Sequence, residues 1–392
     1  MSVRFPLLAV AAAAAICGVL APALAMQERT AISAPWAVGP DGSLMKDVTL
    51  IIADGRIERV LQGPANVNVD RTIRFETGVI SPGLIDVAST LGVVGDNVER
   101  KSVFDPDASV VDALDALSAT LRAAGQSGVT AAMIRPAPSG IISGAAATVR
   151  TIAPQGVERL LRADGPLTLT LGPGAWDVDL GPTSRAGVLH ELREAMRSAR
   201  SGGGTSRLAR MVRGELDVLV EADSAEDVDA ALRLFGQYGL SPAIRHTSDA
   251  VETAEDLAEN QGVVIVGPYT FSSEIRLLAG PGRLAQAGCE VAFSGGLPFL
   301  EPDALRLSAA LAVRYGLDPA AARRGLTINA ARAAGLGNRV GALTPGADAD
   351  IVIFSGDPLR LDSSVVEVWI AGQRVHHASP QPSQEEDGWR AW

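Results

Sequence analysis

Short runs of apolar, β-rich residues lie near both ends of the chain, and two-residue turn signals separate them. Residues 48–52 and 56–60 flank Asp54-Gly55, a dipeptide that readily adopts the positive φ angles of a tight hairpin turn. Near the other end, residues 365–370 and 373–376 flank Ala371-Gly372, after a further such run at 350–354. The pattern predicts β-hairpins at both ends of the chain.

An isolated two-stranded hairpin is at best marginally stable in water. We therefore expect the two end segments, residues 26–78 and 341–378, to pair into one small composite β-sandwich domain.

Between these segments, residues 79–340 alternate between buried-strand runs and amphipathic helical runs. The strand runs lie at 128–134, 216–221, 241–246, 263–267 and 288–294, and the helical runs at 112–124, 185–200, 224–238, 250–261 and 303–315. This alternation predicts a parallel sheet in an α/β fold, and about eight such units fit a (β/α)8 TIM barrel.

The first 25 residues have the features of a cleavable secretory signal peptide. Arg4 precedes an apolar run, and Ala23-Leu24-Ala25 fits a signal-peptidase site. Cleavage there removes Cys17 and leaves Cys289 as the one cysteine, so no intramolecular disulfide is expected. We expect an exported, periplasmic protein without a membrane anchor after cleavage, ending in a polar tail at 379–392.

The net charge of −11 comes from acidic residues spread along the chain rather than gathered in blocks. This distribution argues against nucleic acid as a partner.

Three motifs carry a family resemblance. Residues 79–92 read VISPGLIDVASTLG, residues 182–193 read PTSRAGVLHELR, and TINAAR at 327–332 is followed by GLGNRVGALTPGADAD at 335–350. These segments resemble the metal-dependent amidohydrolase superfamily, in particular its imidazolonepropionase-like members. The resemblance implies a TIM barrel with a composite β-domain, and a hydrolase that acts on non-peptide C–N bonds.

The resemblance also implies a metal site, and this chain departs from it at most positions. A His-x-His pair is expected where Ala88 and Thr90 stand, a histidine at Glu221, and an aspartate near Gly295. His246 alone matches a histidine position, and the two lysines, Lys46 and Lys101, do not suit a bridging role. A catalytic zinc needs three protein ligands, so we expect no metal and no other cofactor.

A remnant site is the alternative. Glu221, Asp223 and His246 could hold one zinc ion at the carboxyl-terminal rim of the barrel, or they could form a hydrogen-bonded cluster beside Arg245. These three residues are the catalytic candidates.

Other reactive side chains have ordinary structural interpretations. His190 lies on the polar side of a helical run, and His376 and His377 follow the last strand as surface residues or as an adventitious metal site. Cys289 is expected to be a buried small apolar residue.

The barrel mouth retains polar residues that could bind a small ligand, namely Asp86, Ser89, Asp96, Arg135, Ser143, Glu221, Asp223, His246 and Ser294. Three functions remain open. The first is a non-catalytic partner subunit, in a homo-oligomer or beside an active amidohydrolase paralogue. The second is a divergent hydrolase of cyclic amides or other C–N bonds with an altered mononuclear or metal-free site. The third is a binding protein for a small polar molecule.

Overall fold

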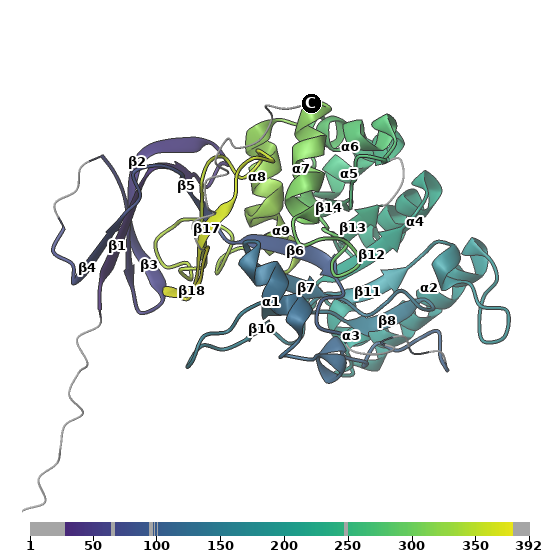
Figure 1. Cartoon of the computed structure of the whole chain (residues 1–392). Coiled ribbons are helices and arrows are strands. Elements are labelled where there is room, and N and C mark those ends of the chain that lie inside the picture. The colour runs from purple at the N-terminus through teal and green to yellow at the C-terminus, as the bar shows by residue number, and fades with distance from the viewer. Residues whose placement is uncertain are drawn as a thin grey trace, which may run out of the picture.

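The computed structural model describes residues 28–378 except 64–66, 94–96, 98, 100 and 247–249. A small β-rich part built from both ends of the chain lies beside a larger α/β part (Figure 1). The proposed signal peptide, the polar tail and Asp96 fall outside the described residues. Within the described residues, no helix combines the length and apolar character needed to cross a membrane.

The small part is one mixed eight-stranded sheet in the order β18-β17-β16-β5-β1-β2-β3, with β4 also paired to β1. Its strands from the first end are β1 (Thr30–Val38), β2 (Leu44–Ala53), β3 (Arg56–Gln62), β4 (Arg71–Arg74) and β5 (Val79–Pro82). Those from the other end are β16 (Ile351–Phe354), β17 (Val365–Ile370) and β18 (Gln373–His377). The two ends meet where β5 pairs with β16, so the strands form one hydrogen-bonded sheet where a sandwich was expected.

Both expected hairpin turns are present. Asp54 and Gly55 have φ angles of 54° and 72°, and Ala371 and Gly372 have 48° and 72°. Such paired positive angles match the right-handed twist of the flanking strands. The turns therefore fix the register of β2 against β3 and of β17 against β18.

The α/β part contains two sheets whose strands run through the interior. One sheet has the order β10-β9-β7-β6 and the other β15-β14-β13-β12-β11-β8. Their strands are β6 (Leu84–Ser89), β7 (Val129–Ile134), β8 (Ile142–Ala145), β9 (Ala147–Arg150), β10 (Leu160–Arg162), β11 (Leu167–Thr170), β12 (Val218–Ala222), β13 (Ala243–His246), β14 (Val263–Val266) and β15 (Glu290–Phe293).

This arrangement differs from eight uniform βα units in two ways. Between β7 and β11, the segment formed by β8 and β9 runs antiparallel to both neighbours and joins the two sheets. No hydrogen-bonded ladder joins β15 to β6 among the described residues. The α/β alternation is therefore present, but a continuous closed barrel is not detected.

Helices follow most parallel strands and cover the outside of the sheets (Figure 1). They are α1 (Ala119–Gln126), α2 (Arg185–Gly202), α3 (Arg207–Val212), α4 (Ala225–Gly236), α5 (Ala254–Asn260), α6 (Ile275–Gln286), α7 (Ala304–Arg314), α8 (Pro319–Leu326) and α9 (Ile328–Ala333). Single 3₁₀ turns lie at Val110–Ala113, Pro173–Ala175 and Ala250–Thr253. The expected helix at 112–124 is replaced by the first of these turns and the shorter α1.

Local capping explains where several helices begin. The Ser184 hydroxyl accepts from Gly187 N at the start of α2, and the Ser224 hydroxyl accepts from Asp227 N at the start of α4. Each such side-chain oxygen satisfies one of the unpaired N–H groups of the first helical turn.

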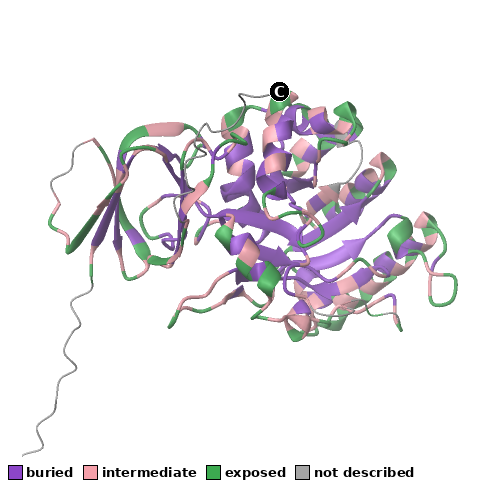
Figure 2. Ribbon diagram, viewed as in Figure 1, coloured by how far each residue is buried: buried purple, intermediate pink, exposed green. Residues whose placement is uncertain are grey.

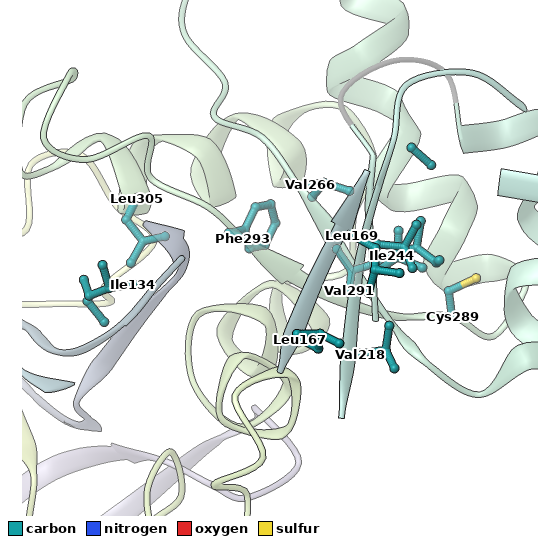
Figure 3. Packing of buried hydrophobic residues seen from close by; sticks show 14 of the residues in the cluster. Ile134, Leu167, Leu169, Val218, Ile244, Val266, Cys289, Val291, Phe293 and Leu305 are labelled. Atoms are coloured by element: carbon teal, nitrogen blue, oxygen red, sulfur yellow. The ribbon is translucent and has the colours of Figure 1, made fainter. Parts of the chain in front are cut away.

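The strands of the α/β part are almost wholly buried, and the exposed residues lie on the helices and loops (Figure 2). In the core, Phe293 of β15, Val266 of β14 and Leu305 of α7 belong to one buried cluster (Figure 3). A second cluster, which includes Leu219, Ile265 and residues of α9, is separate from it.

A buried ion network joins the two parts. Arg150 on β9, 2% exposed, places Nη2 2.6 Å from Asp348 Oδ2 and Nε 3.3 Å from Asp350 Oδ2. Asp350 Oδ1 accepts from Ala371 N, and Arg339 Nε lies 2.9 Å from Asp348. Burial raises the pKa of Asp350, against the lowering effect of Arg150. The two aspartates of the closing sequence motif thus hold the small sheet against the α/β part.

Candidate functional site

The residues at the expected His-x-His positions contact neighbouring loops. Ala88 lies in β6 with a φ of 60°, a left-handed conformation that is strained for a residue with a Cβ. Its carbonyl oxygen accepts from Arg135 Nε at 3.3 Å. Thr90 donates from its backbone N and its hydroxyl to the carbonyl of Leu297, at 3.2 and 3.3 Å. Neither residue supplies a metal ligand of the expected type.

Glu221 is the centre of a buried ion cluster. It is paired in register with Arg245 on the next strand. Glu221 Oε2 accepts from Arg245 Nη1 at 3.0 Å, and Oε1 lies 2.9 Å from Arg135 Nε. The second contact is an ion pair without hydrogen-bond alignment, because the Arg135 Nε–H is directed at Ala88, and Oε1 has no hydrogen-bond partner. All three side chains are at most 14% exposed.

These three residues lie at the carboxyl ends of parallel strands. Arg135 follows β7 directly, Glu221 is near the end of β12, and Arg245 is near the end of β13. The carboxyl end is the face at which enzymes of this architecture place their active sites. The cluster therefore occupies the position where a catalytic centre was expected.

Asp86 on β6 adds a second carboxyl group. It is fully buried, and its Oδ1 accepts from Gly295 N at 2.7 Å while Oδ2 has no partner among the described residues. Burial raises the pKa of Asp86 to about 7. The hydrogen bond from Gly295, the nearby Ser89 hydroxyl and the charges of Arg245 and Arg135 lower the pKa, but burial outweighs them.

Gly295 itself has little room for a side chain. A Cβ built there would lie 3.1 Å from the Cβ of Leu305 and 3.2 Å from Leu297 Cγ. An aspartate at this position would require α7 or the loop after β15 to shift.

The other predicted candidates either lie apart from this cluster or have side chains that the structure does not describe. Asp223 is exposed just after β12. The backbone of His246 ends β13 in register with Ala222, while its side chain is outside what the structure describes. Ser143 Oγ hydrogen-bonds locally to the backbone of Ser139, and Ser294 is buried after β15.

The remaining histidines and the cysteine have structural surroundings. His190 is exposed on α2, and His377 Nδ1 lies 3.1 Å from Glu367 Oε1 on the neighbouring strand. Burial and the neighbouring His377 lower the pKa of His376. Cys289 is buried and its thiol donates to the carbonyl of Ala254, and burial raises its pKa to about 11.

The donor set at the mouth does not fit a divalent metal. Glu221 is bound to two guanidinium groups, and Ala88 and Gly295 have no ligand atoms. The two guanidinium groups carry more positive charge than the one Glu221 carboxylate can offset, and this disfavours a further cation beside them. Among the residues that the structure describes, no group of three histidine, cysteine or acidic side chains could hold a metal ion.

The sequence predicts a hydrogen-bonded cluster beside Arg245 as the alternative to a metal site, and Arg245 does bind Glu221, but Arg135 was not identified as a second partner. The contact with Arg245 also has a signal in the strand pattern. Residues on neighbouring parallel strands at equal distance from the strand ends share a layer, which places Glu221 beside Arg245.

Comparison with known proteins gives two sequence matches. Residues 291–375 match the model of the amidohydrolase family. A stretch of 75 residues is 40% identical to amidohydrolase tasK of Hapsidospora irregularis. It covers 19% of this chain and 8% of that protein, so the match spans less than a tenth of the curated relative.

Solved structures match over most of the chain. An amidohydrolase from Thermotoga maritima superimposes with a TM-score of 0.79 at 22% identity, covering 89% of this chain and all of that one. A putative prolidase from Bifidobacterium longum has a TM-score of 0.57 at 18% identity, covering 91% and 96%. The A. niger ochratoxinase has 0.56 at 16% identity, covering 90% and 96%. These likenesses concern the fold.

Proposed function

We propose that the chain is a non-catalytic member of the amidohydrolase superfamily, in which a buried ion cluster stands in place of the metal centre. One observation carries the proposal. Glu221, at the expected strand-five ligand position, is held between the guanidinium groups of Arg135 and Arg245.

The expected metal site has lost ligands, and it has also gained the positive charges of two arginines. Losing one histidine ligand weakens a site, whereas two buried cations at the same place oppose binding of any further cation. Ala88 and Thr90 supply no imidazole, and Leu305 lies against the position at which a strand-eight aspartate would stand. The expected ligand positions are thus neutral at Ala88 and Thr90, crowded at Gly295, and at Glu221 occupied by a carboxylate that two arginines already neutralise.

A scaffold without its metal chemistry can be retained for what it binds. The proposed role is that of an exported partner subunit, in the periplasm, in a homo-oligomer or beside an active paralogue. The signal-peptide features of residues 1–25 support export. The largely intact fold supports this role, because binding a partner subunit depends on the shape of the protein surface.

Metal content tests the proposal. The mature protein is incubated with zinc or manganese, passed through a desalting column and examined by elemental analysis. We expect well below one tightly held metal per chain. The double variant His376→Ala/His377→Ala serves as control, because it removes an adventitious surface site without touching the mouth.

About one metal per chain, retained in that control and lost in Glu221→Gln, would overturn the proposal. It would mean that the arginines move aside and that Glu221 is a ligand.

A hydrolase with an altered site is the second candidate, and Asp86 favours it. A buried carboxyl group with a pKa of about 7 at the mouth of this fold has the properties of a general acid or base. Hydrolysis of a cyclic amide by the metal-free protein that is abolished in Asp86→Asn, while folding is retained, would support this candidate over the first.

A further inference from the structure

Large apolar side chains are exposed on the loops at the carboxyl ends of the parallel strands. Of the eight large hydrophobic residues that are exposed within the described part of the chain, Leu361 alone lies away from these loops. Six of them lie in the connections after β11, β14 and β15 or on the first residue of the helix that follows. We call these six the apolar rim, and they are Trp176, Val178, Leu180, Phe271, Ile275 and Phe299.

The rim is accessible to a partner of protein size. Phe299, Val178 and Phe271 are 86%, 85% and 75% exposed. Together the six side chains expose roughly 700 Å² of apolar surface, since a fully exposed side chain of these types presents about 100–250 Å². An exposed apolar patch beyond roughly a few hundred Å² marks an interaction site, and a standard protein interface buries about 800 Å² on each partner. The rim therefore suffices for the apolar centre of a protein interface.

The loops that carry the rim contact one another. Gly296 of the loop after β15 lies against Pro268 of the loop after β14. The connection after β6 lies between these loops and the one after β11. Its first residue, Thr90, is hydrogen-bonded to Leu297, and its Val103 lies against Gly181. The rim therefore belongs to one set of contacting loops around the mouth.

The same loops are acidic. Residues 171–184, 267–274 and 294–303 contain five acidic residues and no lysine, arginine or histidine. These five are Asp177, Asp179, Glu274, Glu301 and Asp303. Among the described residues, only Asp303 of this set is ion-paired, with Arg306 at 3.6 Å.

The nearest basic residues along the chain do not cancel this charge. Arg185 and Arg276 lie at the starts of α2 and α6, and Arg185 is already bound to Asp227. The apolar rim is therefore flanked by an excess of negative charge.

We propose that the apolar rim is the docking surface for a different protein, whose contacting face combines apolar side chains with lysine or arginine. Apolar contact would supply the centre of that interface, and the acidic residues would pair with the partner's cations around it. The inference rests on the proposed function, because a partner bound here covers the mouth at which a catalytic member of this fold receives its substrate.

Charge disfavours two other occupants. In a two-fold symmetric dimer the same patch of both copies meets, so a second copy of this chain would bring five acidic residues towards five. An anionic membrane surface attracts lysine and arginine and would be repelled by these loops.

Calorimetric titration of the full mature chain with three peptides tests the chemistry of the partner. The first is a helical peptide with leucine on one face and lysine on the other. In the second peptide glutamate replaces each lysine, and in the third serine replaces each leucine. We expect the first to bind at least about tenfold more tightly than either of the others. Its binding should weaken as salt is added, because exposed charge pairs are screened.

Two matched pairs of variants locate the site. Phe271→Ser/Phe299→Ser should weaken binding of the first peptide by about tenfold or more, whereas Leu361→Ser, between β16 and β17, should leave it unchanged. Glu301→Lys should weaken it by about fivefold, whereas Glu259→Lys, near the end of α5, should change it by less than about twofold. All of these side chains are exposed, so each variant is expected to fold.

Equal affinity for the three peptides, or equal effects of a rim variant and its control, would overturn the inference. A dimer of the free protein in sedimentation that is lost in Phe271→Ser/Phe299→Ser would also overturn it, because a second copy would then occupy the rim. Binding to anionic lipid vesicles that is lost in the same variant would overturn it in favour of a membrane.

The metal content of the same sample separates this inference from the proposed function. A protein that holds about one metal per chain and still prefers the first peptide would contradict the non-catalytic role but not the docking surface. A metal-free protein without that preference would contradict the docking surface alone.

Discussion

The backbone N–H of Gly295 donates to the Asp86 carboxylate at 2.7 Å, and this bond connects the end of β15 to β6 where no strand ladder joins them. Thr90 and Leu297 add backbone and hydroxyl hydrogen bonds close by. A side chain from the first parallel strand therefore takes over part of the role that backbone pairing has elsewhere in the sheets.

The raised pKa of Asp86 predicts a pH effect on stability. In the unfolded chain this carboxyl ionises near 3.8, whereas in the folded protein it ionises near 7, so the folded state holds the extra proton between these values. Stability from this group is therefore lost as pH rises from about 4 to about 7, by about 4 kcal/mol in total. Asp86→Asn retains an acceptor oxygen for Gly295. Its free energy of unfolding should therefore increase relative to that of the wild type as the pH rises over this range.

Urea unfolding at pH 4.5 and pH 8 measures this difference. Asp256→Asn, at an exposed site on α5, is the control and should show no comparable pH dependence relative to the wild type. A stability difference between Asp86→Asn and wild type that does not change with pH would refute the assignment.

Glu221→Gln should destabilise the protein by about 3–5 kcal/mol, because it leaves two buried guanidinium groups without their counter-charge. The triple variant Glu221→Gln/Arg135→Met/Arg245→Met removes the charges together and should recover most of that loss. Chemical denaturation of the variants measures both effects. A single-variant loss below about 1 kcal/mol would show that the cluster is solvated like a surface pair.

Arg150→Ala should destabilise the protein by about 3–5 kcal/mol, since it leaves Asp348 and Asp350 buried beside an empty space. Arg56→Ala is the matched control. Arg56 also contacts Asp348, but at 3.5 Å and with a side chain that is 56% exposed, so a change below about 1 kcal/mol is expected. Thermal unfolding compares the two, and equal losses would contradict a special role for Arg150.

Cys289 should react slowly with a thiol reagent in the folded protein. A pKa of about 11 leaves a thiolate fraction at pH 7.5 that is a few hundredfold below that of an unperturbed cysteine with a pKa of about 8.5. Labelling rates in buffer and in denaturant measure the ratio. Fast labelling of the native protein would mean that the thiol is accessible and ionised.

The elements set by local sequence were predictable. Asp54-Gly55 and Ala371-Gly372 form the expected hairpin turns, and the helix expected at 185–200 is present as α2. In each case the determining interactions lie within a few residues of one another, and the sequence displays them directly.

Features that depend on pairing between distant segments were not predictable. Nothing local in residues 142–150 indicates that this segment runs antiparallel and joins two sheets, because strand direction is decided by its partners β7 and β11. Likewise Glu221 was considered as a remnant ligand, and its partnership with Arg135 emerges only when β7 and β12 are placed around the same mouth.

The pairing of β5 with β16 joins residues about 270 positions apart, and this has a consequence for how the protein is made. While the chain is being synthesised, one edge of β5 has no neighbour until residues 351–354 emerge. A chain that stops earlier would present bare N–H and C=O groups at that edge, a template for joining other chains. Truncated products of this protein are therefore expected to be prone to aggregation, and the sheet that contains the N-terminal strands is expected to be among the last parts of the fold to be completed.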